Sequence, residues 1–271
     1  SAASDVYKRQ DQGKRSGLFL FSKKLYSKFV IVNRDTRVVR DIKMKYTTIL
    51  LDFDDTIVDF YDAEEKAFYN MAKHFNHYPT EEDFYYFRKV NQSHWEAFQE
   101  NKLTKVEVLT LRFVNYFKDY NFEVDGNLAD NLFRDELAKA TPSFFDGTLD
   151  TIDYLRKKHN IYIVTNGVTE TQQRRLAQTT FNETLNGIFI SEQAGYQKPM
   201  PEFFDYIFKE MGETHREKAI IVGDSLTSDI LGGKNANIAT CWFNLRNKEN
   251  NTTIQPDYEI KSLKELIDIV E

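Results

Sequence analysis

The first residues in this sequence that could carry out chemistry are two aspartates at the end of a short apolar segment. Asp52 and Asp54 follow residues 46–51, which are rich in β-branched and apolar side chains. Because alternate residues of an extended chain point to the same side, the two carboxylates are expected to face one place. Acidic turns exposed to solvent are also common at strand ends, so the pair alone leaves that alternative open.

Two further candidate segments lie later in the chain. Thr165-Asn166-Gly167 combines a hydroxyl, an amide and a flexible backbone, which can donate hydrogen bonds to phosphate oxygens. Asn-Gly is also an ordinary turn sequence. Lys198-Pro199 places a cation in a rigid loop before a helix that is expected to begin near Pro201. The alternative for Lys198 is an ordinary surface lysine.

A second acidic pair completes the set of candidates. Gly223-Asp224 follows the apolar residues 220–222, and Asp229 comes five positions after Asp224. Hard oxygen ligands in such a cluster suit Mg²⁺, which proteins usually hold with one or two carboxylates, waters and a substrate phosphate. All four segments lie at the end of an expected strand or in the loop beyond it. The complete set is therefore more specific than any of its members.

The elements that position these residues alternate along the chain. Strands are expected at Tyr46–Phe53, Ile161–Thr165, Ile188–Ile190, Ala219–Val222 and Ala239–Phe243. Helices are expected at Asp62–His77, Thr80–Glu100, Thr104–Tyr120, Asn127–Ala140, Thr148–Lys158, Thr169–Gln178, Pro201–Glu210 and Ser262–Val270. Alternating strands and helices predict a mostly parallel sheet with helices on both faces. The fold class is therefore α/β, a Rossmann-like parallel sheet core with an inserted α-helical cap domain.

The domain boundaries follow from where this alternation is interrupted. Residues 60–144 contain no comparable strand and are predicted to form the helical cap, while 44–59 and 145–271 form the catalytic core. A cap inserted after the first strand would cover the carboxyl edge of the sheet. Ligands bind at that edge in open α/β sheets.

The first 43 residues differ from the rest in charge. They carry 11 Lys and Arg against 4 Asp, a net charge of +7, whereas residues 44–271 carry 25 basic and 38 acidic residues, a net of −13. A basic arm could tether the chain to nucleic acid or membrane, or be a targeting peptide. Asp5-Val6-Tyr7-Lys8-Arg9-Gln10 also matches the translation of a transposase end sequence (GAT GTG TAT AAG AGA CAG). Because Met44 lies just before the first strand, we expect residues 1–43 to be non-native or disordered.

Composition limits the class of protein. The chain has 41% hydrophobic and 29% charged residues, as in an ordinary globular protein. Its net charge of −6 argues against binding nucleic-acid polymers or anionic lipid. No apolar run approaches the roughly 18 residues of a membrane span. The single cysteine, Cys241, fits a reducing compartment, so a cytoplasmic protein is expected. The sequence does not indicate an oligomeric state.

The four segments together resemble the haloacid dehalogenase-like hydrolase superfamily, most of whose members are phosphatases. The motifs that carry the resemblance are Asp52-Phe53-Asp54-Asp55-Thr56, Thr165-Asn166-Gly167, Lys198-Pro199 and Gly223-Asp224 with Asp229. The resemblance covers essentially all of residues 44–271. At finer grain the chain is similar to the pyrimidine 5′-nucleotidase subgroup, which has a helical cap after the first strand. The supporting stretches are 90–95, 190–195, 228–233 and 239–244.

The resemblance implies a mechanism that uses the first aspartate pair. Asp52 would be the nucleophile and form an aspartyl-phosphate. Asp54 would protonate the leaving alkoxide and then deprotonate the attacking water. Mg²⁺ would be held by Asp52, the main-chain carbonyl of Asp54 and Asp224, and would contact a phosphate oxygen. Because dehalogenases of the superfamily lack the second aspartate, Asp54 favours phosphoryl transfer over carbon–halogen hydrolysis.

The remaining motif residues would bind the phosphoryl group. The resemblance assigns Thr165, the backbone of Asn166 and Lys198 to its oxygens. Lys198 and the metal would also offset the repulsion between the aspartates and the phosphate dianion. Asp229 would lie behind them and orient Lys198 or a metal-bound water.

The expected activity is therefore Mg²⁺-dependent hydrolysis of small phosphomonoesters, with a pyrimidine nucleoside 5′-monophosphate as the favoured substrate. Selectivity must come from the cap, where Asn91 and Trp95 lie four residues apart on one helix face. An amide can pair with a pyrimidine edge, and an indole can stack on the ring. The alternative is that Trp95 is cap core and Asn91 a solvated neighbour. A sugar-phosphate phosphatase, a phosphomutase or a catalytically silent binding module are the other functions that this pattern leaves open.

Overall fold

The computed structural model describes residues 27–33, 36–42, 44–212 and 216–271, with side chains described from Met44 onward. The chain divides into two compact units between Lys43 and Met44. In the first unit, strands β1 (Ser27–Asn33) and β2 (Thr36–Ile42) pair antiparallel. The hexapeptide at residues 5–10 that matches the transposase end sequence lies outside the described residues.

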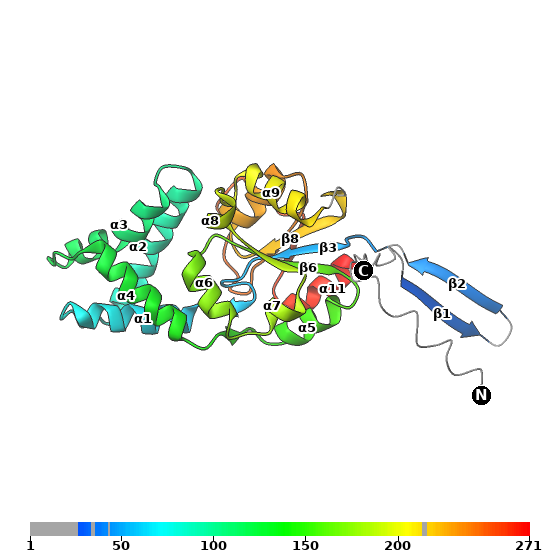
Figure 1. Cartoon of the computed structure of the whole chain (residues 1–271), viewed down its shortest axis with the longest axis horizontal. Helices are drawn as coiled ribbons and strands as arrows, with labels where there is room; N and C mark the ends of the chain where they lie inside the picture. Colours follow the sequence, from blue (N-terminus) through cyan, green and yellow to red (C-terminus); the bar gives the residue numbers. More distant parts are fainter. Residues whose placement is uncertain (1–26, 34–35, 43, 213–215) are drawn as a thin grey trace, which may run out of the picture. The chain divides into compact units, whose positions relative to one another are not determined.

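The second unit is built on a six-stranded sheet with the order β10-β9-β8-β3-β6-β7 (Figure 1). All five neighbouring pairs are parallel. The strands are β3 (Thr48–Leu51), β6 (Asn160–Thr165), β7 (Gly187–Ile190), β8 (Ala219–Gly223), β9 (Ala239–Phe243) and β10 (Tyr258–Ile260). The predicted α/β class with a parallel sheet is confirmed.

The central strands are mostly apolar because both faces of the sheet are covered. Every residue of β3 and β8 is buried, as expected for strands between two helical layers. Ile49 and Leu51 of β3 contribute to one hydrophobic cluster. Leu50, which points to the opposite face, joins a second cluster with Phe203 and Phe204. This alternation fixes which strand residues reach the carboxyl edge.

Helices connect the strands of the core. They are α5 (Thr148–Leu155), α6 (Thr169–Leu176), α7 (Phe181–Thr184), α8 (Ser191–Ala194), α9 (Pro201–Met211), α10 (Leu231–Asn235) and α11 (Leu266–Val270). Residues 226–230 form a single π-helical turn before α10. The predicted helix over 148–158 ends at Leu155, because the amides of Lys157 and Lys158 bond to Tyr154 and Leu155 in a tighter turn.

The structure also differs from the prediction at the first strand and at one edge of the sheet. The first strand is shorter than the predicted Tyr46–Phe53, because the amides of Ile57 and Val58 both bond to the Phe53 carbonyl and turn the chain. The edge strand β10 was not predicted. It has three residues and includes the charged Glu259, which is too little for a recognisable pattern.

Four helices are inserted between β4 (Val58–Asp59) and β5 (Ser143–Phe144), two short strands that pair antiparallel. They are α1 (Tyr61–His74), α2 (Glu81–Gln99), α3 (Lys105–Asp119) and α4 (Gly126–Lys139). We refer to α1–α4 as the helical insertion. Figure 1 shows it as a separate bundle beside the sheet, where α4 contacts α6 of the core.

The sequence of the helical insertion explains both its helix starts and its core. Thr80 and Thr104 each form a capping box, with Asp83 and Glu107 respectively. Aromatic side chains fill its interior, where the rings of Phe68 and Phe87 stack with centroids 4.6 Å apart.

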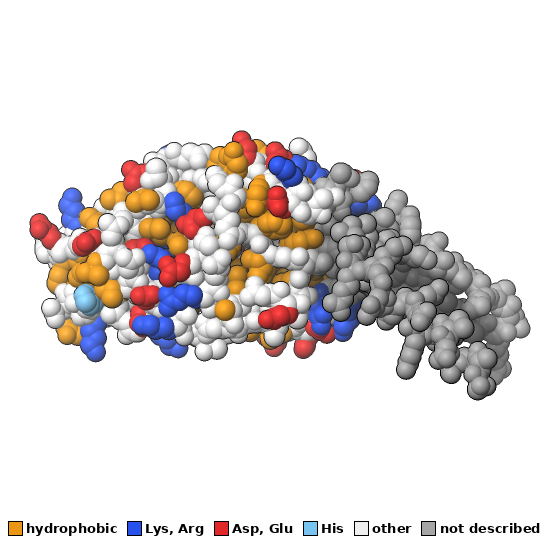
Figure 2. All heavy atoms as spheres, in the orientation of Figure 1, with side chains coloured by type: hydrophobic (Ala, Val, Ile, Leu, Met, Phe, Trp, Pro, Cys, Tyr) orange, Lys and Arg blue, Asp and Glu red, His pale blue; other side chains and the backbone are white. Residues whose placement is uncertain are grey.

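The described surface carries mixed charge. On the face drawn in Figure 2, acidic and basic side chains are interspersed and do not form a field of one sign. Within the described part of the chain, no helix has the length and apolar character that crossing a membrane requires.

Candidate active site

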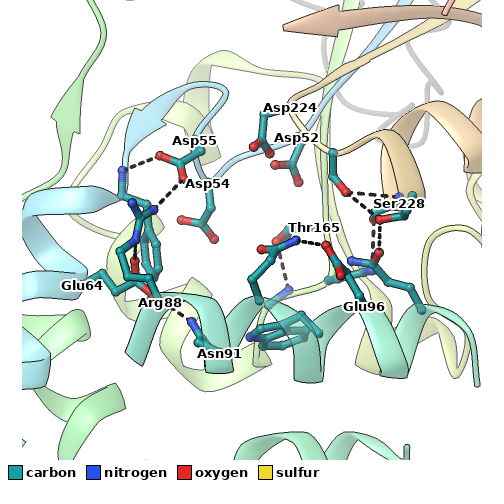
Figure 3. A pocket seen from close by; sticks show the side chains of 18 of the residues that line it. Asp52, Asp54, Asp55, Glu64, Arg88, Asn91, Glu96, Thr165, Asp224 and Ser228 are labelled. Atoms are coloured by element: carbon teal, nitrogen blue, oxygen red, sulfur yellow. Dashed lines mark hydrogen bonds and ion pairs between the residues drawn. The ribbon is translucent and has the colours of Figure 1, made fainter. Parts of the chain in front are cut away.

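The candidate residues meet at one edge of the sheet because their strands are parallel neighbours. Asp52 follows β3, Thr165 ends β6 and Asp224 follows β8, and the sheet order is β8-β3-β6. The backbone N–H of Asp52 donates to Val222 O at 2.9 Å, which keeps the two strand ends in register. A cavity of about 780 Å³ opens above this edge and is bounded on its other side by the helical insertion (Figure 3).

Lys198 is a buried cation at the floor of this cavity. Its Nζ donates to Asp52 Oδ1 at 2.6 Å, to Asp229 Oδ1 at 2.7 Å and to Val164 O at 2.8 Å. Its side chain is 2% exposed, so the surface-lysine alternative does not hold. Burial by itself lowers the pKa of Lys198, but Asp229 and Asp52 raise it by more, and the net pKa is above the ordinary lysine value. The ammonium is therefore held charged beside Asp52.

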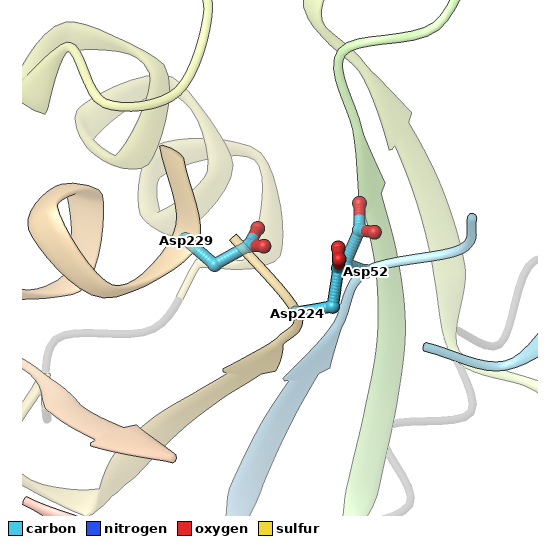
Figure 4. Close-up of side chains that lie close together, drawn as sticks. All are labelled: Asp52, Asp224 and Asp229. Carbon is cyan, nitrogen blue, oxygen red and sulfur yellow. The ribbon is translucent and has the colours of Figure 1, made fainter. Parts of the chain in front are cut away.

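Three aspartates gather beside Lys198. One carboxylate oxygen from each of Asp52, Asp224 and Asp229 lies within 4.8 Å of the others (Figure 4). Burial raises the pKa of Asp52 well above its ordinary value, against the opposing effect of Lys198. Burial also raises the pKa of Asp224 to about 6. A second cation at this place would relieve the repulsion between these carboxylates.

The donors present fit a hard divalent cation. Asp229 already uses both oxygens, since Oδ1 accepts from Lys198 and Oδ2 accepts from the Ser225 amide at 3.1 Å. Asp52 and Asp224 each retain an oxygen that makes no hydrogen bond within the described residues. Two carboxylates with room for waters and a phosphate oxygen suit Mg²⁺. Asp229 instead holds the Lys198 ammonium through the bond to Oδ1.

Gly223 is required for this close arrangement. A Cβ atom at position 223 would lie 2.1 Å from Asp229 Cγ, which real structures do not tolerate. Because Gly223 has no side chain, the Asp229 carboxylate can lie directly against its backbone at the end of β8.

Thr165 and Asn166, the predicted phosphate-binding residues, are engaged in different ways. Thr165 is buried, and its Oγ1 accepts from Gly167 N at 3.1 Å and from Gln172 Nε2 at 2.9 Å. Because the oxygen accepts both bonds, its own proton is available to another acceptor. The Asn166 side chain bonds instead to the backbone of Lys198, so only the main chain of Asn166 is available to a phosphate.

Asp54 is held by two residues that the sequence analysis missed. Arg175 Nη1 donates to Asp54 Oδ1 at 2.5 Å, and Gln172 Nε2 donates to Asp54 Oδ2 at 2.9 Å. Both come from α6, which contains one large apolar residue, Leu176. A helix of this composition that packs against a core must bury polar side chains. This composition was the one sequence signal that pointed to Gln172 and Arg175.

Lys248 is a third functional candidate that the sequence analysis missed. Its Nζ donates to Asp224 Oδ2 at 2.9 Å from the loop after β9. Nothing in the local sequence of this polar loop distinguishes Lys248 from other surface lysines.

The predicted selectivity residues both line the cavity, but their surroundings differ from the prediction. Asn91 is buried, its Nδ2 donates to Glu64 Oε1 at 2.8 Å, and its Oδ1 accepts from Arg112 Nη1 at 2.9 Å. Both ends of its amide are thus engaged within the helical insertion, and it is not a solvated neighbour. Trp95 is half-buried, with Lys105 Nζ 5.2 Å from its ring centroid.

Lys105 joins the helical insertion to the core. Its Nζ donates to the backbone carbonyl of Asn166 and lies 3.4 Å from Gly167 O and 3.6 Å from Glu192 Oε1. Burial lowers the pKa of Lys105 to about 8, although Glu192 opposes the shift. The start of α3 therefore rests on the loop that follows β6.

A family model and the related proteins that match this chain all indicate the same family. Residues 46–237 match the family model described as haloacid dehalogenase-like hydrolase. The chain is 40% identical to the putative HAD-hydrolase YfnB of Bacillus subtilis, over 83% of this chain and 96% of that protein. It is 34% identical to the pyrimidine 5′-nucleotidase PynA of Streptococcus pneumoniae (84% and 96%). It is 32% identical to the pyrimidine 5′-nucleotidase YjjG of Escherichia coli (82% and 97%).

Solved structures agree with the fold. The magnesium-bound structure of Bacillus subtilis YfnB superposes with a TM-score of 0.79, over 84% of this chain and 99% of that one. A predicted phosphoglycolate phosphatase from Haemophilus somnus, at 19% identity, has a TM-score of 0.67 over 84% and 99% and supports the fold alone.

Proposed function

The chain belongs to the haloacid dehalogenase-like hydrolase family, and from that premise we propose that it hydrolyses phosphate monoesters with Asp52 as nucleophile. The observation that carries the proposal is the bond from Lys198 Nζ to Asp52 Oδ1 at 2.6 Å, beside Asp224 and Thr165. This bond uses one lone pair of Oδ1, so Oδ1 keeps a second lone pair for a cation and Oδ2 remains without a partner among the described residues for the attack. A buried carboxylate with one free oxygen beside a fixed cation is suited to attack an anionic phosphoryl group.

The proposed reaction has two steps. Asp52 attacks phosphorus, the bond to the ester oxygen breaks, and Asp54 gives its proton to the leaving alkoxide. Asp54 then takes a proton from a water that attacks the aspartyl-phosphate, which releases inorganic phosphate and restores Asp52. Thr165 and the backbone of Asn166 would donate to the phosphoryl oxygens in both steps. Lys198 already uses its three N–H donors on Asp52, Asp229 and Val164 O, so it would exchange one of these bonds to bind a phosphoryl oxygen.

We propose that the reaction depends on Mg²⁺. Asp52, Asp224 and the main-chain carbonyl of Asp54 would hold the ion, which when bound neutralises charge on the phosphate. The proposal is supported by the donor set described above and by the magnesium bound to the related YfnB. Asp229 would keep Lys198 oriented and would not be a ligand.

The substrate that we propose is a pyrimidine nucleoside 5′-monophosphate. Two relatives that match nearly full length are named pyrimidine 5′-nucleotidases. The cavity volume of about 780 Å³ lies in the range of small-molecule sites. Its wall from the helical insertion includes the apolar side chains of Trp95, Leu109 and Phe133, which could contact a base. Residues 60–144 would then act as a cap that excludes water. A cytoplasmic location is part of the proposal.

Phosphate release with Mg²⁺ tests the proposed activity and substrate together. We expect kcat/KM for UMP, dUMP and dTMP to exceed that for AMP and a hexose phosphate, and EDTA to abolish turnover until excess Mg²⁺ is added. A preference for the hexose phosphate would contradict the nucleotide assignment and favour the sugar-phosphate alternatives. No release from any ester would contradict the phosphatase assignment.

Melting temperature gives a second readout for the metal that does not depend on activity. Binding to the folded state alone raises stability by mass action. We expect Mg²⁺ to raise the melting temperature of the wild type, and to raise that of Asp224→Asn less.

A further inference from the structure

We propose that Arg175 and Gln172 of α6 are positioning residues that hold Asp54 for proton transfer to the leaving group. This inference rests on the proposed function and adds two residues to it. The three side chains form a closed set that we call the α6 clamp: Arg175, Gln172 and Asp54. The two α6 residues lie three positions apart and so share one face of the helix.

The clamp uses both oxygens of Asp54. Arg175 Nη1 donates to Oδ1 at 2.5 Å, and Gln172 Nε2 donates to Oδ2 at 2.9 Å. Each carboxylate oxygen can accept more than one hydrogen bond. The clamp therefore fixes the plane of the Asp54 carboxyl group. It leaves a lone pair that can carry the proton given to the leaving oxygen and can later accept a proton from the attacking water.

The clamp is itself rigid. The side chain of Arg175 is 4% exposed, and its Cζ lies 5.0 Å from the ring centroids of both Phe53 and Phe60. Its Nη1 also donates to Gln172 Oε1 at 2.9 Å. Because that bond engages the carbonyl end of the amide, the NH₂ end of Gln172 must face Asp54.

The same NH₂ group links Asp54 to the phosphate-binding hydroxyl. Gln172 Nε2 donates to Thr165 Oγ1 at 2.9 Å as well as to Asp54. One amide thus sets the separation between the residue that binds the phosphoryl group and the residue that transfers its proton. Gly167 leaves room for this amide, since a Cβ there would lie 2.5 Å from Gln172 Cδ.

Leaving-group dependence separates positioning of Asp54 from a merely structural role. An alkyl ester such as UMP needs a proton on its leaving oxygen, whereas dinitrophenyl phosphate releases a stable anion that does not. The parameter kcat/KM reports the steps up to the first irreversible one, and so isolates attack on the ester from later hydrolysis of the aspartyl-phosphate. The variants are Arg175→Met and Gln172→Met, which remove the donors, and Arg175→Lys, which keeps the charge.

We expect kcat/KM for UMP, or for the alkyl ester that the wild type hydrolyses best, to fall by about 10²-fold in the two Met variants. For dinitrophenyl phosphate we expect a fall of less than about tenfold, which is the pattern that Asp54→Asn should also show. Arg175→Lys should recover part of the loss with the alkyl ester. Arg174→Met is the matched control, because Arg174 lies on the same helix, is 40% exposed and pairs with Asp135.

Equal losses with the two esters would overturn the proposal and show a structural role. Unchanged turnover of the alkyl ester would also overturn it, because Arg175 and Gln172 would then have no effect on proton transfer by Asp54. Increased turnover would overturn it as well, because the two residues would then hinder Asp54. If Arg175→Met fails to fold, Gln172→Met and Gly167→Ala, which displaces the amide, give the same test. Absence of turnover of either ester by the wild type would instead contradict the proposed function, and the clamp with it.

Discussion

The side chain of Asn166 forms a reciprocal pair of hydrogen bonds with the backbone of Lys198, 32 residues away. Oδ1 accepts from the Lys198 N–H at 2.9 Å, and Nδ2 donates to the Lys198 carbonyl at 2.8 Å. The loop that follows β6 thereby fixes the backbone of Lys198, from which the side chain extends to Asp52. We therefore expect the Asn166 side chain to affect substrate binding only through Lys198.

Asn166→Ala should therefore weaken both stability and phosphate binding. Loss of two part-buried hydrogen bonds is expected to lower the free energy of unfolding by about 1–3 kcal/mol. KM for the phosphate ester should rise, because the backbone of Lys198 is then no longer fixed by the Asn166 side chain. Urea unfolding and steady-state kinetics measure the two effects. A variant with unchanged KM would show that Lys198 keeps its place without Asn166.

Lys105 should make stability depend on pH in a direction set by its burial. Its pKa is lowered from the ordinary 10.5 to about 8 in the folded chain. Between these values the unfolded chain binds one more proton than the folded chain, so the free energy of unfolding rises with pH. The slope from this group is at most about 1.4 kcal/mol per pH unit.

The difference between wild type and Lys105→Met isolates this effect from other titrating groups. We expect the wild type to gain stability relative to the variant as pH rises through that window, measured by urea unfolding at several pH values. A difference that does not change with pH would show that Lys105 is exposed in solution and that α3 does not rest on the Asn166 loop.

Gly223→Ala should disturb the aspartate cluster without removing any functional group. The new Cβ would overlap the Asp229 carboxylate, which must move and release Lys198. We expect a loss of about 1–3 kcal/mol in unfolding free energy together with reduced kcat. Gly187→Ala is the control, since its Cβ would meet only the Tyr162 ring at 3.2 Å. If Gly223→Ala is as active as this control, the close approach of Asp229 is not needed.

The two cavity residues of α2, Asn91 and Trp95, should differ in what they control. Asn91→Ala leaves buried Glu64 and Arg112 each without one partner, so we expect a stability loss of about 1–3 kcal/mol.

Trp95→Leu removes a large ring from the cavity wall and should raise KM for nucleotides more than for dinitrophenyl phosphate. Unfolding curves and KM ratios test the pair. Equal KM ratios in wild type and Trp95→Leu would remove Trp95 from base binding.

The sequence was sufficient to predict five of the six strands of the sheet and the motifs at their ends, because those signals are local. An apolar run followed by Asp52, or by Gly223-Asp224, marks a strand end, and parallel strands bring such ends together without further information. Gln172 and Arg175 could not be assigned, since their partner Asp54 lies more than 110 residues away and depends on how α6 packs. The engagement of Asn91 by Glu64 and Arg112 likewise depends on the packing of three helices.

The most direct test of the central claim is turnover by Asp52→Asn. The substitution keeps the shape of the side chain and removes the nucleophilic carboxylate, so covalent catalysis should be lost. With Mg²⁺ and the best phosphate ester of the wild type, we expect phosphate release to fall by more than about 10²-fold while the variant remains folded by thermal melting. A folded Asp52→Asn protein that retains more than about a hundredth of wild-type turnover would contradict the assignment of Asp52 as nucleophile.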